Sequence, residues 1–412
     1  MDEATATLES GAARRAAEAL LARNMLFAAH AIQHILSGSL PVLLLFVRPE
    51  FDLSYTDIGL IVAAGNLTGG LAQMPAGLIV DRWGARRVLL GGYALTLVSL
   101  FMFATAGAMS TLLVSRLIMG FGQATFHPAS FPEMARATKH TGVSMGMALH
   151  SVGGNIGQAG GYSITVLLAA LLGWRWALQT MILAGAVLSV AFAVYYPRLP
   201  DDDDSPPAAE AKRPSSEPGK ITQENESWLP AVYLSVAATL SGAFGMSLTS
   251  FLPTFLTAAR GASEAVSGGL STLKLLSGTA GAVFGGRAGD RFDRSNVVLI
   301  STAITTLLVL ILAGAPLGTV TLVLTLILLG FFHTMARPCL NAITTEIAPR
   351  GRTGGVFGLV FGAMAVGGSL AGPVVGYIAD TYSLQVAFAF IAFLYMAHGI
   401  LIKRSYAKIT GG

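Results

Sequence analysis

Two basic residues, Lys274 and Arg337, lie deep inside long apolar segments of the chain. No aspartate or glutamate lies at a comparable depth, because the nearest ones stand close to segment ends: Glu133, Glu346, Asp57 and Glu264. A buried charge without a partner in a low dielectric is costly, so these cations need a counter-charge. A bound anion such as a carboxylate or a phosphonate would supply it. The alternative is that carbonyls or water neutralise the cations, or that one side chain extends to a surface.

Histidines form a second group inside apolar segments: His30, His34, His127, His150 and His333. His30 and His34 are four residues apart and share one helix face. Imidazole titrates near physiological pH, so His30, His34, His127 and His150 are candidates for carrying a coupled proton. Two other interpretations stay open, because such histidines can share a metal ion or serve as hydrogen-bonded core residues. We expect neither a resident metal nor another cofactor.

Polar residues of the first half of the chain would complete an anion site opposite the two deep cations. The candidates are Gln33, His34, Arg116 and Asn155. An arginine inside lipid must face protein or water. Arg116 is therefore either a structural residue bonded to backbone carbonyls or a residue for coupling or substrate.

These residues stand in a chain whose composition fits a lipid solvent. Of its 412 residues, 53% are hydrophobic and 12% are charged, whereas soluble proteins average about 25% charged residues. A membrane-spanning helix needs about 20 apolar residues. The sequence predicts twelve spans, at 24–46, 56–80, 87–107, 111–133, 142–171, 174–197, 229–258, 264–287, 296–316, 318–346, 353–379 and 384–403.

The predicted fold is an all-α membrane protein with twelve transmembrane helices in two pseudo-symmetric six-helix bundles around a central cavity. The bundles are residues 24–197 and 229–405, with cytoplasmic tails at 1–23 and 406–412. Residues 198–228 contain the run Asp201 to Asp204 and several prolines, so they predict a flexible cytoplasmic linker. Lysines and arginines concentrate on the cytoplasmic side of membrane proteins. With both termini in the cytoplasm, the external loops carry only Arg48, Arg175 and Arg260.

The two halves repeat each other. Gly77-Leu-Ile-Val-Asp81-Arg82 corresponds to Gly286-Arg-Ala-Gly-Asp290-Arg291, 209 residues later. Gly120-Phe121 with His127-Pro128 corresponds to Gly330-Phe331 with Arg337-Pro338, 210 residues later. Duplicated halves about an axis normal to the membrane are one design of transporters.

The loop segment Gly77-Leu-Ile-Val-Asp81-Arg82-Trp-Gly84-Ala-Arg86-Arg87 resembles the G-x-x-x-D-R/K-x-G-R-R/K motif of the major facilitator superfamily. Arg116-Leu-Ile-Met-Gly120-Phe-Gly122 is similar to its span-4 motif. The resemblance implies rocker-switch alternating access and a cytoplasmic latch between the halves in the outward-open state. Its residues would be Gly77, Asp81, Arg82, Gly84, Arg86, Gly286, Asp290 and Arg291. The second copy has Asp293 in place of Gly84, so we expect a weaker latch there.

A branch-level resemblance rests on Phe-His127-Pro128-Ala and on His30-Ala-Ile-Gln-His34, which resemble the fosmidomycin-resistance-like branch. It would fit an anionic phosphonate-type cargo. Span 5 carries Gly153, Gly157 and Gly161 at four-residue spacing, which favours close contact with another helix. The family's usual Gly-Pro pair is absent from span 5, which weakens an exporter assignment.

No phosphate-binding loop and no hydrolase motif occurs, so we expect neither an enzyme nor an ATP-driven pump. The sequence predicts a secondary transporter of a small organic anion in the inner membrane, proton-coupled or exchanging a counter-solute. It predicts contact with lipid, no nucleic-acid partner and a monomer. The alternatives are a drug or toxic-metabolite exporter, a metal or metal-chelate transporter using the histidines, and a membrane sensor without transport.

Overall fold

The protein is helical in the part described by the computed structural model, which comprises residues 2–139, 141, 143–197, 228–348 and 353–410. The first half contains α1 (Asp2–Gly38), α2 (Leu40–Glu50), α3 (Tyr55–Trp83), α4 (Ala85–Ala104), α5 (Met109–Ala124), α6 (Phe126–Ala137), α7 (Val143–Leu172) and α8 (Trp174–Tyr195). The second contains α9 (Leu229–Ala258), α10 (Glu264–Arg291), α11 (Arg294–Gly314), α12 (Thr319–Ile347), α13 (Thr353–Thr381) and α14 (Leu384–Thr410). The predicted linker lies outside the described residues except for Trp228.

Two predicted spans are each divided into two helices. The first span breaks at Ser39, between α1 and α2, and the fourth breaks at Thr125, between α5 and α6. Pro41 and Pro128 follow these breaks, and a proline ring clashes with the carbonyl four residues earlier. Because the two helices of each pair continue in one direction, each pair counts as one rod, meaning one predicted span. The chain therefore forms the twelve rods that the sequence predicts.

Nine stretches of the described helices are long and apolar enough to cross a membrane. The rods that do not meet this criterion are α3, α10 and the α5–α6 pair. Helices α3 and α10 are both rich in glycine, α10 also carries several serine and threonine residues, and both pack against the opposite half of the molecule. Protein therefore replaces lipid along one face of each, which explains their lower hydropathy.

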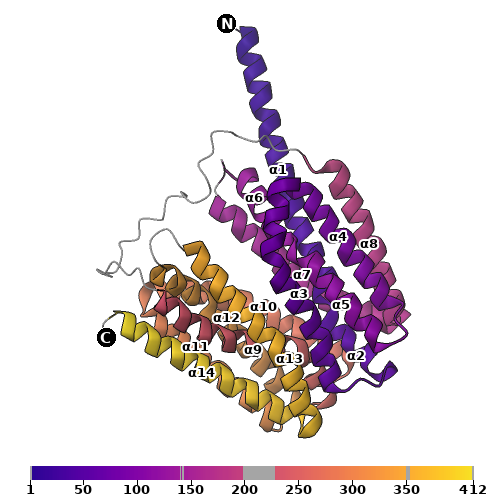
Figure 1. Ribbon diagram of the computed structural model, residues 1–412, viewed down its shortest axis with the longest axis vertical. Coiled ribbons are helices and arrows are strands. Elements are labelled where there is room, and N and C mark those ends of the chain that lie inside the picture. Colours follow the sequence, from indigo (N-terminus) through magenta and orange to yellow (C-terminus); the bar gives the residue numbers. More distant parts are fainter. Residues whose placement is uncertain (1, 140, 142, 198–227, 349–352, 411–412) are drawn as a thin grey trace.

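The chain ends differ from the predicted boundaries. Helix α1 runs without a break from Asp2, so the predicted tail 1–23 is part of the same helix as the first span. Helix α14 likewise runs through the predicted tail to Thr410. In Figure 1, the N-terminal part of α1 projects away from the bundles.

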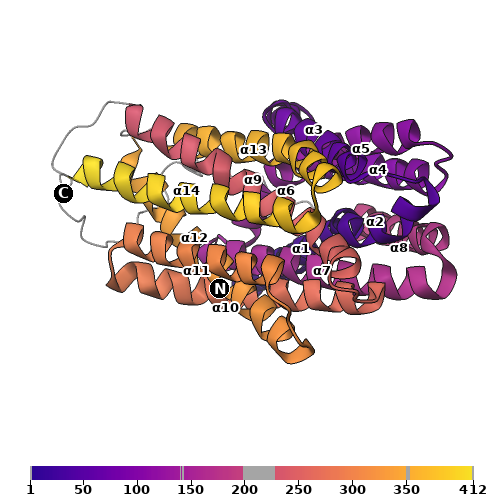
Figure 2. The same cartoon turned by 90° about the horizontal axis from the view of Figure 1, so that it is seen from below.

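The helices form two bundles, α1–α8 and α9–α14, which meet along two pairs of helices. Helix α3 packs against α13, and α7 packs against α10, with α2 also touching α9. Figure 2 shows these two pairs on opposite sides of the junction. We call the side with the N-terminal end of α1 and the C-terminal end of α14 the termini side, and the opposite side the far side. Toward the termini side the bundles diverge (Figure 1).

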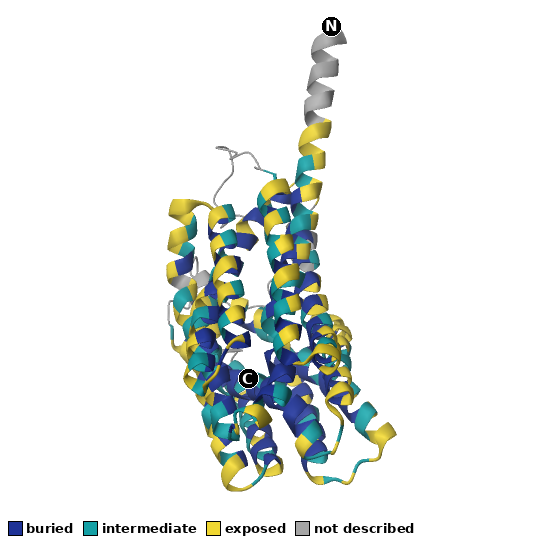
Figure 3. Ribbon diagram, turned by 90° about the vertical axis from the view of Figure 1, so that its right-hand side faces the viewer, coloured by how far each residue is buried: buried dark blue, intermediate teal, exposed yellow. Residues whose placement is uncertain are grey.

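The hydrophobic clusters show where the two bundles are joined and where they are separate. One large cluster combines residues of both bundles, including Leu36, Phe103, Phe244 and Phe388. Two further clusters each belong to one bundle, one around Leu26 and the other centred on helices α9, α11 and α12. Figure 3 shows buried residues gathered away from the N-terminal end of α1. The bundles are therefore joined by apolar packing on the far side and have separate cores on the termini side.

The predicted repeat is visible in the packing of α3 on α5 and of α10 on α12. A Cβ at Gly120 would meet the Gly65 carbonyl oxygen at 2.4 Å, and a Cβ at Gly330 would meet that of Lys274 at 2.0 Å. Gly65 and Lys274 are 209 residues apart, the offset of the loop motifs. Both halves thus use a glycine at the same place to let two backbones touch.

Candidate functional site

Lys274 and Arg337 lie on neighbouring helices, α10 and α12, as an interacting pair of cations. Lys274 is 5% exposed, whereas Arg337 is exposed. Their charges lie close enough to influence each other, and both act on the buried His333, one helical turn before Arg337. Among the described residues, neither side chain has a hydrogen bond or an ion pair. The structure therefore brings together the two cations that the sequence singled out, and adds His333 to them.

The carboxylates near the ends of the neighbouring helices already have partners of their own. Glu133 accepts a hydrogen bond from the Tyr196 hydroxyl at 2.7 Å and pairs with Arg136. Glu346 accepts one from Tyr406 at 2.8 Å and also pairs with Arg294. These acids are satisfied locally, so they leave the positive charge of Lys274 and Arg337 uncompensated.

Arg116 on α5 is buried and turned toward α3. Its Nε donates to the Ile61 carbonyl at 3.4 Å, and its guanidinium fills the space above Gly65, where a Cβ would lie 2.5 Å from Nη2. Met119 Sδ lies 2.6 Å from Nη1. These contacts are to α3 and to its own helix, and none of them is to the candidate binding residues Gln33 and His34.

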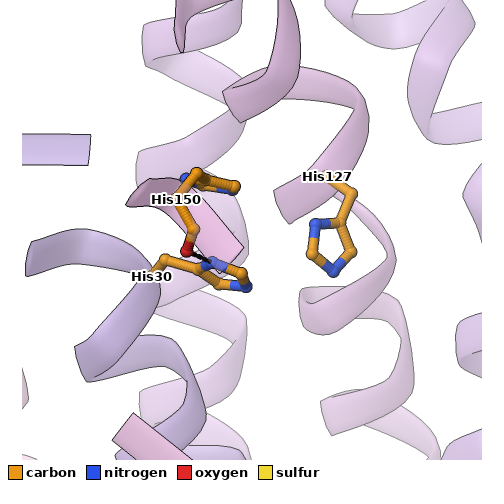
Figure 4. A group of neighbouring side chains, drawn as sticks. All are labelled: His30, His127 and His150. Carbon is orange, nitrogen blue, oxygen red and sulfur yellow. Dashed lines mark hydrogen bonds between the residues drawn. The ribbon is translucent and has the colours of Figure 1, made fainter. Parts of the chain in front are cut away.

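Four histidines gather in the first bundle around His30 on α1. The His30 ring stacks on His150 of α7 at a centroid distance of 4.0 Å, and it contacts the rings of His34 at 4.8 Å and His127 of α6 at 5.2 Å. Figure 4 shows His30 and His150 side by side, with His127 facing them from another helix. The sequence proposed these four residues separately, and the tertiary structure makes them one cluster.

The glycine stripe of α7 explains how this cluster forms. Cβ atoms at Gly153 and Gly157 would lie 2.7 and 2.1 Å from the carbonyl oxygens of Phe27 and Ala31, so α1 and α7 touch along their backbones. A Cβ at Gly154 would lie 2.6 Å from the His30 ring. Small residues on α7 therefore make the room that the imidazole occupies.

The remaining predicted binding residues are dispersed. Gln33 on α1 is buried and its amide nitrogen has no partner among the described residues, while His34 beside it is half-buried. Asn155 on α7 is exposed. His34 thus belongs with the histidine cluster through its ring contact with His30, and Gln33 is its neighbour on α1.

The predicted latch residues lie on the termini side, where the bundles are apart. Asp81, Arg82, Gly84, Asp290 and Arg291 are exposed. Nothing lies within 4 Å of a Cβ placed on Gly77 of α3. Arg86 donates a hydrogen bond to the Ala193 carbonyl within its own bundle, and Gly286 faces Pro338 in the other. In this conformation the motif does not connect the two halves among the described residues.

The two copies of the loop turn the chain in different ways. Gly84 has a φ of +79°, which a glycine adopts without strain, and it both ends α3 and precedes α4. In the second copy Asp293 caps α11 instead, accepting a hydrogen bond from the Asn296 N–H at 2.9 Å. A helix cap thus stands where the first copy has its glycine turn.

A contact between the halves that the sequence analysis missed lies on the far side. The Asp380 carboxylate at the end of α13 accepts hydrogen bonds from the Tyr55 and Thr56 N–H groups, both at 2.8 Å, and from the Thr56 hydroxyl at 2.6 Å. These donors form the N-terminus of α3, whose partial positive charge favours an anion. We call this set the far-side latch.

A sequence signal for the far-side latch did exist. Gly376-Tyr-Ile-Ala-Asp380 has the same G-x-x-x-D spacing as Gly77 to Asp81 and Gly286 to Asp290. A Cβ at Gly376 would lie 2.3 Å from the Tyr55 carbonyl oxygen, so the glycine permits the approach that Asp380 completes one turn later.

Comparisons with known proteins agree with this architecture. Over 377 residues the chain is 29% identical to the fosmidomycin resistance protein of Escherichia coli (strain K12), covering 88% of each chain. Over 431 residues it is 23% identical to the D-galactonate transporter of Escherichia coli O6:H1, covering 94% of each. Its fold matches the crystal structure of a mutant of the nucleoside transporter NupG with a TM-score of 0.78 at 16% identity, over 93% of this chain and 99% of that one.

The match to a family extends over both bundles. Residues 26–269 and 234–408 fit the family described as the Major Facilitator Superfamily. This range includes the repeated loops, the two deep cations and the helices that join the halves. The chain belongs to the Major Facilitator Superfamily.

Proposed function

We propose that this multi-pass membrane protein is a secondary transporter that carries a small organic anion by alternating access. The observation that carries the proposal is the pair Lys274 and Arg337, which has no carboxylate partner in the described structure. Lys274 is the buried member of the pair, and leaving a buried charge unpaired is costly. A bound carboxylate, phosphonate or similar oxyanion would compensate both cations at once, and an exposed Arg337 is accessible to it.

The relatives are compatible with such a substrate. The D-galactonate transporter is named for a sugar acid, which carries a carboxylate. Because that relative is 23% identical, the proposal for this chain rests on its own cations. His333 lies beside them, and its ring can donate a hydrogen bond to the same anion.

Coupling is assigned to the histidine cluster or to a counter-solute. His30, His34, His127 and His150 are in ring contact, and imidazoles exchange protons near neutral pH. No deep carboxylate is available among the described residues to take this role, since Glu133 is held by Tyr196 and Arg136.

The conformational cycle uses the two ends of the α3–α13 pair. We place the termini in the cytoplasm of the inner membrane, so that the far side is external and the described conformation opens inward. Breaking the far-side latch of Asp380 and joining Asp81 to the other half would then give the outward-open state. A single chain contains all these parts, which supports a monomer.

The test combines ligand binding with one substitution. Purified protein in detergent is screened by thermal unfolding with galactonate, other small carboxylates, phosphonates and inorganic oxyanions, because a ligand of the folded state raises the midpoint. We expect one anion class to stabilise the protein and Lys274→Ala to abolish this shift. The matched control is Arg404→Ala, an exposed cation at the end of α14. Anion binding that survives in a folded Lys274→Ala protein would refute the assignment.

Export of a drug or toxic metabolite is the second candidate, because one relative is a resistance protein. It predicts that expression raises cellular resistance and that apolar drugs stabilise the purified protein. Resistance that is unchanged in Lys274→Ala would favour this candidate over the anion carrier.

A further inference from the structure

We propose that His30, His127 and His150 form a binding site for one divalent transition-metal ion of the zinc, cobalt or nickel class. Each residue offers one ring nitrogen, and these nitrogens lie within 4.8 Å of one another. The three residues come from α1, α6 and α7, so only the folded bundle brings them together (Figure 4).

The hydrogen bond of His30 leaves one of its nitrogens free to bind a metal. Its Nδ1 lies 2.6 Å from the His150 carbonyl oxygen. A carbonyl only accepts, so Nδ1 carries the hydrogen, and in the neutral ring Nε2 then keeps its lone pair. Metal-binding histidines commonly donate their other N–H to a carbonyl in this way, which fixes the tautomer and the ring orientation.

The other two residues offer comparable atoms. His150 is fully buried, and its Nε2 lies 3.2 Å from the Ser130 hydroxyl, which leaves Nδ1 without a partner. His127 Nδ1 is also buried without a partner, although the residue as a whole is partly exposed. Three nitrogen atoms in one cluster thus lack hydrogen-bond partners among the described residues: His30 Nε2, His127 Nδ1 and His150 Nδ1.

If these histidines were only packing residues of the core, one buried ring nitrogen without a hydrogen-bond partner would be easier to explain than three in one cluster. His398 in the second bundle also has a buried Nε2 without a partner, while its Nδ1 lies 2.8 Å from the Ala237 carbonyl oxygen. The fold therefore tolerates a single unpartnered imidazole nitrogen. In the first bundle the unpartnered nitrogens are instead gathered in one cluster, where a single ion can bind all three after the rings reorient.

The donor set selects the class of ion. Three neutral imidazoles and no carboxylate suit zinc, cobalt, nickel or copper rather than magnesium or calcium, which prefer oxygen. Zn–N distances of about 2.0–2.1 Å place tetrahedral ligand nitrogens about 3.4 Å apart. The rings must therefore approach each other on binding, and the partly exposed His127 is the one freest to move. The rings of His30 and His150 are stacked 18° from parallel, and an imidazole nitrogen binds a metal in the plane of its ring, so one of these two rings must also turn. Three protein ligands leave a fourth position open for water or an anion.

The test titrates cobalt into protein without a polyhistidine tag, after metal removal by a chelator and in buffer free of candidate anions. We expect saturation at one Co²⁺ per chain, visible absorption bands of a low-coordinate site, and displacement by Zn²⁺. His127→Asn should weaken binding at least about tenfold, because loss of a ligand should cost no less than loss of a group hydrogen-bonded to one. The matched control, His398→Asn, should bind cobalt as the unchanged protein does.

Two results would overturn the site. One is the absence of saturable binding at one equivalent, and the other is equal cobalt affinity in His127→Asn and His398→Asn. If His127→Asn aggregates, X-ray absorption of the zinc-loaded unchanged protein decides the matter, because a shell with imidazole nitrogens supports the site and an oxygen-only shell refutes it. Neither measurement uses an organic anion, so the outcome is independent of the proposed anion site at Lys274 and Arg337. A metal held by these histidines would leave coupling to the counter-solute.

Discussion

The two ends of the α3–α13 helix pair contrast sharply. On the far side, a Cβ at Gly59 would lie 2.2 Å from the Gly372 carbonyl oxygen, and Asp380 accepts hydrogen bonds from Tyr55 and Thr56. Toward the termini side, nothing lies within 4 Å of a Cβ at Gly77, Gly358 or Gly362. The same two helices are thus in backbone contact at one end and separate at the other.

The difference suggests how one sequence pattern could serve the two conformations of the proposed transport cycle. Helices α3 and α13 are antiparallel, and each ends in G-x-x-x-D, at Asp81 and Asp380 respectively. Asp380 lies at the N-terminus of α3, which favours a carboxylate electrostatically. By the same physics, we expect Asp81 to meet the N-terminal end of α13 in the outward-open state that the proposed alternating access requires. The following predictions test this reciprocity.

The largest effect is expected for Gly59→Leu. Its Cβ would overlap the Gly372 backbone, so the far side cannot close without separating the helices. Spin labels at the exposed positions 83 and 292, introduced after replacing Cys339 with serine, should shift to a shorter distance, and solute flux should fall at least tenfold. Gly91→Leu in α4 is the control, because nothing lies within 4 Å of a Cβ there. An unchanged distance distribution in Gly59→Leu would show that this contact does not hold the far side closed.

Asp380→Asn should shift the conformational equilibrium in the same direction by a smaller amount. It weakens charge-assisted hydrogen bonds worth about 1.5–3 kcal/mol, which corresponds to a population change of about tenfold or more. The same spin-label pair measures the shift. Thr56→Val, which removes only the side-chain donor, should give a smaller shift of the same sign. A shift toward the described conformation would contradict the role of Asp380.

Asp81→Asn should move the equilibrium the opposite way. Asp81 is exposed in the described conformation, so its loss costs nothing here and removes stabilisation only from the alternative one. We expect a few-fold depletion of the short-distance population, and near-normal populations when Asp81→Asn and Asp380→Asn are combined. If both single substitutions shift the distances in the same direction, the two G-x-x-x-D ends are not reciprocal.

The smallest effect is expected for Asp293→Ala in the second loop. Loss of a helix N-cap costs about 1 kcal/mol, so thermal unfolding in detergent should begin a few degrees lower. Burial acts to raise the pKa of the Asp293 carboxyl, but hydrogen bonds from Ser295 and the Asn296 N–H hold the pKa below its ordinary value. The stabilisation is thus present at neutral pH and is lost as the pH falls through the lowered pKa. The variant and the unchanged protein should converge in stability at low pH, and a constant difference would exclude this cap as its cause.

Much of the fold could be predicted because lipid imposes strong constraints on sequence. Long apolar segments must be helical to satisfy their backbone groups, so the twelve rods were predictable even where Pro41 and Pro128 divide a rod. The repeat at an offset of 209 or 210 residues indicated two equivalent bundles, and Gly65 and Lys274 now confirm that equivalence in three dimensions.

The candidate site was predictable only as a set of residue types. The apolar surroundings of Lys274, Arg337 and His150 identify them as unusual without specifying their neighbours. Helix rotation decides those neighbours, and it depends on packing against several other helices. For this reason Arg116 turned out to face α3, while His127 joined His30 and His150.

By itself, the sequence determined that the chain crosses a membrane, that it is duplicated, and that its interior carries cations without deep acids. These properties follow from composition and spacing, which act residue by residue. Only the tertiary structure decided that Asp380 binds the start of α3 and that three histidines from separate helices share one cluster. Such contacts join residues far apart in the chain, and the approach of backbones at glycines, which allows them, is visible only once the helices are packed.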